Sequence, residues 1–152
     1  MNKFLLSGGV FSIVAAMLHI AIIIGGPDWY LFWGAGEEMA SLAENGSWIP
    51  PITTFGIFMV LLVWGLYALS GASLIIKLPF LKTVLVIVSS AYTIRGLWLP
   101  YALFFNPDDM TSFMVWTSLT SLAVGIVHIV GAKQVWLSLS GIQTGKVSVQ
   151  RA

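Results

Sequence analysis

Residues 52–82 read ITTFGIFMVLLVWGLYALSGASLIIKLPFLK, and this stretch decides the fold. The run 52–76 holds no charged residue and exceeds the roughly 20 apolar residues that a helix needs to cross a bilayer. Lys77 and Lys82 then enclose a proline, which is typical of a turn. The stretch therefore predicts a transmembrane helix that ends in a basic loop.

Three further apolar runs of similar length surround this one, at 4–25, 83–105 and 112–137. In the whole chain, 58% of residues are hydrophobic and 9% are charged, against about 25% charged in soluble domains. Four spans leave no room for a separate soluble domain. We therefore expect one domain over 1–152, an all-α integral membrane protein that forms a four-transmembrane-helix bundle.

The loop charges predict how the chain is oriented. Six basic residues lie before the first span, between the second and third, or at and after the end of the fourth: Lys3, Lys77, Lys82, Lys133, Lys146 and Arg151. All acidic residues lie in the other two loops: Asp28, Glu37, Glu38, Glu44, Asp108 and Asp109. Because short loops rich in Lys and Arg stay in the cytoplasm, we expect both termini and the tail 138–152 to be cytoplasmic. The expected location is a bacterial inner membrane, crossed several times.

The long outer loop, 27–51, is rich in aromatic residues that settle at the level of lipid headgroups. Within it, residues 36–46 predict a short helix with Glu37 and Glu38 in its first turn and Asn45-Gly46 at its end. We expect this helix to lie at the membrane interface. The alternative is a lid over an outward-facing pocket.

Arg95 is the seventh basic residue, and it lies near the middle of the third span. A central arginine costs about 2.5–3.5 kcal/mol on insertion scales, so it should face protein, water or a partner. Tyr92 and Trp98 lie about one turn away on either side, and they are candidates to line a pocket with Arg95. The alternative is a structural arginine that snorkels and bonds carbonyls or a Tyr hydroxyl inside the bundle.

His19 and His128 each lie on a stripe of small residues, which predicts faces where helices approach closely. The stripes are Gly8, Ser12, Ala16 and His19 in the first span, and Ser118, Ser121, Gly125, His128 and Ala132 in the fourth. Either histidine is a site residue or forms a structural hydrogen bond between helices. At 1.5 Å per residue the two lie about 11 Å apart in depth, which argues against a shared haem. With no Cys and no metal-ligand spacing, we expect no metal and no cofactor.

Two segments carry a resemblance. One runs from His19 through GGPDWY at 25–30 to FWGAGEE at 32–38, and the other is WGLYALSGA at 64–72. Together they resemble a family of small, uncharacterised four-span proteins of the bacterial inner membrane. The resemblance covers the chain and implies fold and location, but no activity.

Three classes of function remain open. The first is a protein without enzymatic activity that associates with itself or with a membrane-protein partner through its small-residue stripes. The second is a binder or transporter of a lipid-like or anionic small molecule, and the third is a membrane enzyme acting on a lipid, although no nucleophile with a matching base is visible. The net charge of +1 gives no reason to expect nucleic acid.

A closed bundle would favour association, whereas a cavity that reaches Arg95 would favour a binding site or an enzyme. The candidate binding residues are Arg95, His19, Tyr92, Trp98, Glu37, Glu38 and His128.

Overall fold

The computed structural model describes residues 1–105 and 111–139, and all regular structure in these ranges is helical. The helices are α1 (Lys3–Gly25), α2 (Pro27–Phe32), α3 (Glu37–Glu44), α4 (Ile49–Gly71), α5 (Leu81–Phe105) and α6 (Ser112–Leu139). Four of them, α1, α4, α5 and α6, are long and apolar enough to cross a membrane. The predicted turn with Asp108 and Asp109, and the tail with Lys146 and Arg151, lie outside the described residues.

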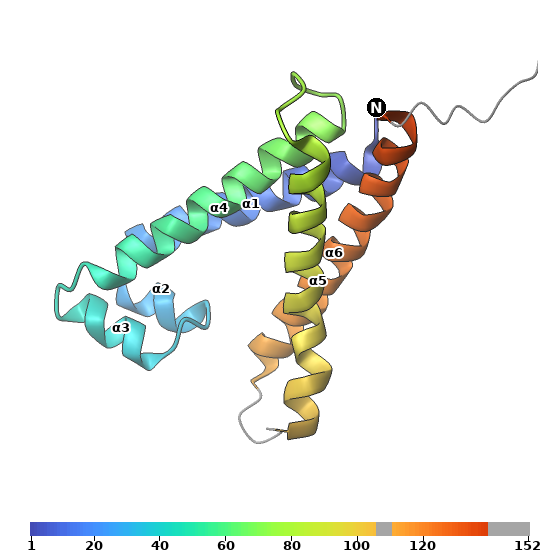
Figure 1. Ribbon diagram of the computed structural model, residues 1–152. Coiled ribbons are helices and arrows are strands. Elements are labelled where there is room, and N and C mark those ends of the chain that lie inside the picture. Colours follow the sequence, from blue (N-terminus) through green and yellow to red (C-terminus); the bar gives the residue numbers. More distant parts are fainter. Residues whose placement is uncertain (106–110, 140–152) are drawn as a thin grey trace, which may run out of the picture.

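The four long helices form two antiparallel pairs that diverge (Figure 1). Helix α1 lies beside α4, and α5 lies beside α6. The pairs meet at the end that carries the N-terminus and the α4–α5 loop, here called the closed end, and they separate toward the other, open end. The sequence predicted four spans, but not this separation into two pairs.

Glycines let the helices within each pair approach closely. A Cβ added at Gly9 of α1 would lie 3.0 Å from the Gly65 carbonyl oxygen of α4. A Cβ at Gly96 of α5 would lie 2.5 Å from the Leu122 side chain of α6. Such contacts are the usual basis of helix association in membranes, where van der Waals packing replaces the hydrophobic effect.

At the closed end the two pairs are joined by an apolar cluster and by one polar side chain. The cluster consists of Leu5, Ala72, Leu81, Leu85 and Val135. Asn2 caps α1, because its side-chain oxygen accepts the N–H groups of Phe4 and Leu5 at 3.1 Å. Its amide also donates to the Gly131 carbonyl of α6 at 2.9 Å. The start of α1 is thereby fixed to α6.

Helix α4 ends at Gly71 and not near Ile76, where the apolar run had placed the end of the span. Ser73 has a φ of 63°, the left-handed conformation that terminates many helices. The Ser70 hydroxyl then donates to the Ile76 carbonyl and accepts the Leu78 N–H, both at 2.9 Å. These bonds hold the last apolar residues in a loop, which hydropathy alone does not reveal.

The segment between α1 and α4 forms two short helices at the open end (Figure 1). Helix α3 lies within the predicted segment 36–46, whereas α2 was not predicted. Tyr30 of α2 is 2% exposed and packs with Ile22 of α1 and Ala40 of α3. The segment is therefore packed against the end of α1.

Candidate functional site

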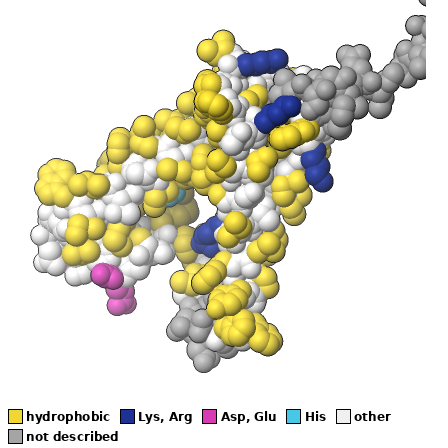
Figure 2. Space-filling model, in the orientation of Figure 1, with side chains coloured by type: hydrophobic (Ala, Val, Ile, Leu, Met, Phe, Trp, Pro, Cys, Tyr) yellow, Lys and Arg dark blue, Asp and Glu magenta, His cyan; other side chains and the backbone are white. Residues whose placement is uncertain are grey.

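A cavity of about 990 Å³ lies between the two helical pairs. Figure 2 shows the hollow between them, with one dark-blue Lys or Arg side chain and a cyan His side chain at its edge. Its lining is mostly apolar and comes from α1, α4, α5 and α6, together with Trp33 from the segment after α2. The polar lining residues are His19, Thr53, Tyr92, Arg95, Thr117, Thr120 and Ser121. The structure thus forms a mostly apolar cleft with a few polar groups, which is typical of a ligand site.

Tyr92, which lines the cavity, forms a hydrogen bond between the two pairs, and this bond is here called the floor of the cavity. The hydroxyl oxygens of Ser12 and Tyr92 lie 2.9 Å apart, and Ser12 also donates to the Gly8 carbonyl at 3.0 Å. Because a serine hydroxyl has one hydrogen, Tyr92 is the donor to Ser12. The Tyr92 ring contacts Trp64 edge to face, with ring centroids 5.3 Å apart.

Arg95 extends from the α5 wall of the cavity toward α6. Its Nη1 donates to the Ser118 hydroxyl at 3.0 Å, and its Nη2 donates to the Thr117 hydroxyl at 3.4 Å. Both acceptors are neutral, and the described lining includes no Asp or Glu. A guanidinium has five N–H donors, so three of them have no partner among the described residues.

His19 lines the opposite wall, on α1. Its Nδ1 lies 2.7 Å from the carbonyl oxygen of Ala15, one turn earlier on the same helix. A carbonyl can only accept, so Nδ1 carries the hydrogen. The structure therefore brings His19, Tyr92 and Arg95, three of the predicted binding residues, to one cavity.

His128 lies beneath this cavity and not in its lining. It is 0% exposed, stacks on the Tyr92 ring with centroids 5.3 Å apart, and donates from Nδ1 to the Val124 carbonyl at 2.9 Å. A Cβ at Gly8 would lie 2.5 Å from its Cε1 atom. His128 thus fills the space that the small residue Gly8 leaves between α1 and α6.

The other predicted site residues lie away from the cavity. Trp98 is 58% exposed and contacts Tyr101, with ring centroids 5.0 Å apart. At about 100° per residue, Trp98 and Tyr92 point about 120° apart around α5, so they do not share a wall. Glu37 lines a separate hollow beside Asp28, and Glu38 is exposed on α3.

The sequence pattern placed Ser118 and Ser121 on a helix contact face, but it did not connect the hydroxyls of α6 with Arg95. Thr117, Thr120 and Ser121 line the cavity, and Ser118 accepts from Arg95. They form the run TSLTS at 117–121, an unusual concentration of hydroxyls in an apolar span. Together with an arginine in the neighbouring span, this run could have predicted that hydroxyl groups of the fourth span bind Arg95.

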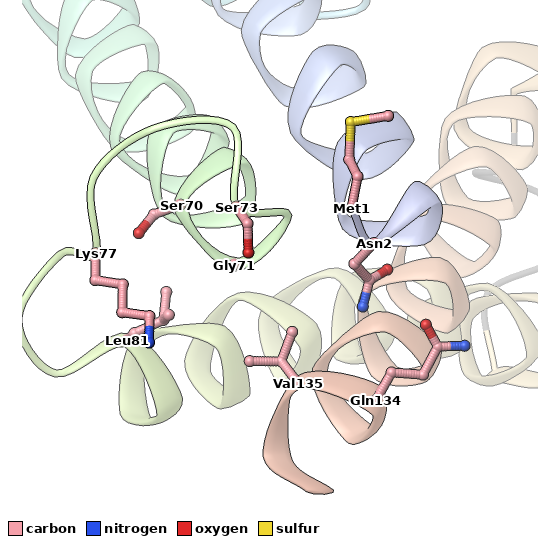
Figure 3. A pocket seen from close by; sticks show the side chains of 9 residues that line it. All are labelled: Met1, Asn2, Ser70, Gly71, Ser73, Lys77, Leu81, Gln134 and Val135. Carbon is pink, nitrogen blue, oxygen red and sulfur yellow. The ribbon is translucent and has the colours of Figure 1, made fainter. Parts of the chain in front are cut away.

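A smaller hollow of about 330 Å³ lies at the closed end (Figure 3). Its lining includes Asn2, Ser70, Ser73, Lys77 and Gln134. The Asn2 side chain already bonds to the start of α1 and to Gly131 within α6, and the Ser70 side chain bonds to the α4–α5 loop. Two of these five polar side chains are therefore used in stabilising the fold, which makes this hollow a weaker candidate.

Among residues 1–105 and 111–139, no group of three His, Asp or Glu side chains could hold a metal ion. Comparison of the chain with protein-family models, with curated proteins and with solved structures finds no match. Function is therefore inferred from the cavity and its residues.

Proposed function

We propose that this protein binds an anionic, lipid-like molecule in the cavity between its two helical pairs. The observation that carries this proposal is Arg95, an exposed charged side chain on the wall of a mostly apolar cavity, whose bonding partners are the neutral hydroxyls of Ser118 and Thr117.

The charge of Arg95 favours an anion. A guanidinium in a low-dielectric site is stabilised most by a carboxylate or phosphate, which its planar N–H donors match in two-point geometry. In the described part of the chain, the cavity lining supplies no such group. A bound anion would use the remaining donors of Arg95 and compensate its charge.

The lining and the position of the cavity favour a lipid-like molecule. Phe11, Val14, Ile57 and Val60 lie on the α1 and α4 side, and all four lie on helices long and apolar enough to cross a membrane. A volume of about 990 Å³ is at the upper end of ordinary ligand sites, about 300–1,000 Å³. An acyl chain would cover these apolar side chains while its head reached Arg95.

The packing of the small-residue stripes weighs against association as the main role. The small residues that suggested association pack inside the chain: Gly8 against His128, and Gly125 against Thr93. Ser12 and Ala16 are both 0% exposed. These four small residues are therefore used in packing within one chain, which favours ligand binding over association as the main role.

We propose further that the chain lies in a bacterial inner membrane with both termini in the cytoplasm. Lys3, Lys77 and Lys82 belong to the closed end, and Asp28 and Glu37 belong to the open end. The excess of lysine on one side supports this orientation. The cavity would then open toward the outer leaflet, with α2 and α3 at its mouth.

Native mass spectrometry of the purified protein tests the proposed ligand. We expect one acidic amphiphile per chain to stay bound to the wild-type protein when it is released from detergent. The mass and fragments of this molecule would identify it. Arg95→Gln should reduce its affinity about 10- to 100-fold, the range of a lost hydrogen bond to a charged group. Arg95→Lys keeps the charge and should retain part of the binding.

The matched control is Lys3→Gln, which removes one positive charge at the closed end, away from the cavity. It should leave the bound molecule in place. If Arg95→Gln and Lys3→Gln, both folded, retain the same molecules as the wild type, the lipid is held at the protein surface and the proposed site is wrong.

A further inference from the structure

Two polar groups face the cavity from opposite helical pairs, and their heights above its floor can be compared. The floor is the Ser12–Tyr92 hydrogen bond, which places the hydroxyl groups of these two residues level. His19 lies about 10 Å beyond Ser12 along α1, at about 1.5 Å per residue.

The guanidinium of Arg95 lies at a similar height on the other wall. Gly96 packs against Leu122, and Gly125 packs against Thr93, which fixes the register of α5 against α6. In this register Ser118, the partner of Arg95 Nη1, lies about 12 Å beyond the level of Tyr92. The guanidinium and the His19 imidazole therefore lie at nearly the same height on opposite walls.

The two groups have complementary hydrogen-bonding character. Arg95 can only donate. In the neutral imidazole of His19, Nδ1 donates to the Ala15 carbonyl, so Nε2 carries a lone pair that can only accept. Among the described residues, Nε2 has no hydrogen-bond partner. The cavity thus presents a fixed donor group on one wall and a fixed acceptor on the other.

We infer that the head of the bound molecule carries both an anionic oxygen, which Arg95 binds, and an O–H donor, which His19 Nε2 accepts. This inference rests on the proposed function and narrows its ligand class to acidic lipids whose head retains a free O–H group. In a phosphomonoester the donor is the O–H group of the protonated phosphate, which donates to His19 Nε2. A phosphodiester with a hydroxyl-bearing head meets it through that hydroxyl.

Three phospholipids with identical acyl chains separate these cases: phosphatidic acid, phosphatidylglycerol and phosphatidylmethanol. The first has a phosphomonoester, the second has a diester with free hydroxyls, and the third is a diester with no O–H group. Phosphatidylglycerol and phosphatidylmethanol carry the same single charge. Their comparison in the delipidated wild-type protein therefore isolates the hydroxyl without any substitution in the chain.

We expect phosphatidic acid, phosphatidylglycerol or both to bind about three- to tenfold more tightly than phosphatidylmethanol, the effect of one neutral hydrogen bond. His19→Leu should abolish this preference, whatever its effect on the affinity for phosphatidylmethanol. His19→Gln should retain the preference, because the carbonyl oxygen of its side chain can take the position of Nε2 and accept the same hydrogen bond. Preference for phosphatidic acid alone would place the donor on the phosphate.

The inference is overturned if phosphatidylmethanol binds as tightly as the other two lipids, or if the preference survives in His19→Leu. Failure of the proposed function looks different. In that case no lipid binds the wild-type protein at one copy per chain, or Arg95→Gln binds all three as the wild type does.

Discussion

The hydroxyl of Tyr92 on α5 donates a hydrogen bond of 2.9 Å to the hydroxyl of Ser12 on α1, and this bond joins the two helical pairs at the floor of the cavity. Hydrogen bonds between membrane helices contribute about 0.6 kcal/mol on average and up to about 1.7 kcal/mol. Tyr92→Phe should therefore cost about 0.5–1.5 kcal/mol. Ser12→Ala should cost more, because it leaves the hydroxyl of Tyr92, a residue 7% exposed, without its acceptor.

The contribution of this bond to the free energy of unfolding can be measured with both single variants and the double variant. Their thermal unfolding is followed by tryptophan fluorescence. The double variant should be less destabilised than the sum of the singles by about 0.6 kcal/mol or more. Strict additivity would mean that the two hydroxyls do not interact in the folded protein.

The close contact between Gly8 and His128 makes a second prediction. A Cβ at Gly8 would lie 2.5 Å from the imidazole, which is fully buried and bonded to Val124. Gly8→Ala should therefore destabilise the protein by about 1–3 kcal/mol, the usual cost of overpacking. Gly56→Ala is the matched control, since nothing lies within 4 Å of its added Cβ.

Melting temperatures of these two variants give the comparison, and Gly56→Ala should not lower the wild-type value. Adding His128→Ala to Gly8→Ala should recover part of the loss, because it empties the space that the new methyl group needs. Equal stability of Gly8→Ala and Gly56→Ala would contradict the packing of α1 against α6.

The mouth of the cavity depends on another glycine contact. Gly34 follows α2 with a φ of 71°, and a Cβ there would clash with the Phe113 ring of α6. Trp33, its neighbour, lines the cavity. The segment after α2 therefore touches the opposite helical pair and restricts the opening between the pairs. Gly34→Ala should push this segment away from α6 and raise the dissociation rate of a bound lipid several-fold.

Gly36→Ala controls for backbone strain, because Gly36 has a φ of 94° but nothing lies within 4 Å of its added Cβ. Both variants bear the cost of a positive φ in a residue with a side chain. Only Gly34→Ala should speed the release of lipid in a competition experiment with a fluorescent phospholipid. Equal release rates from the two variants would show that the contact with Phe113 does not limit exchange.

Hydropathy and small-residue patterns predicted much of this fold. The four long helices follow from the apolar runs, and the buried face of α1 follows from the spacing of Gly8, Ser12 and Ala16. The pairing of the helices was not predictable in this way, because residues that face lipid and residues that face another helix are equally apolar. The separation of the two pairs had no signal in the sequence, although Arg95 indicated that a pocket was one alternative.

The candidate site was predictable only in part. Arg95 and His19 stood out because polar side chains are costly in a membrane, and both line the cavity. Trp98 was chosen from its distance along the chain, although its direction around α5 takes it away from Tyr92. His128 lies on the predicted contact face, but that face meets Gly8 beneath the cavity. The depth of a polar residue in its span therefore predicted the site better than the spacing of residues along a helix.

The proposed topology can be tested directly because the chain contains no cysteine. Ser41 of α3 and Ser73 of the α4–α5 loop are both exposed, and they belong to the open and the closed end. With both termini in the cytoplasm, a membrane-impermeant maleimide should label Ser41→Cys in intact cells and should label Ser73→Cys only after the cells are permeabilised. Labelling in the reverse order, or of both variants in intact cells, would contradict the orientation. The cavity would then not open toward the outer leaflet, and a lipid would have to reach Arg95 from another side.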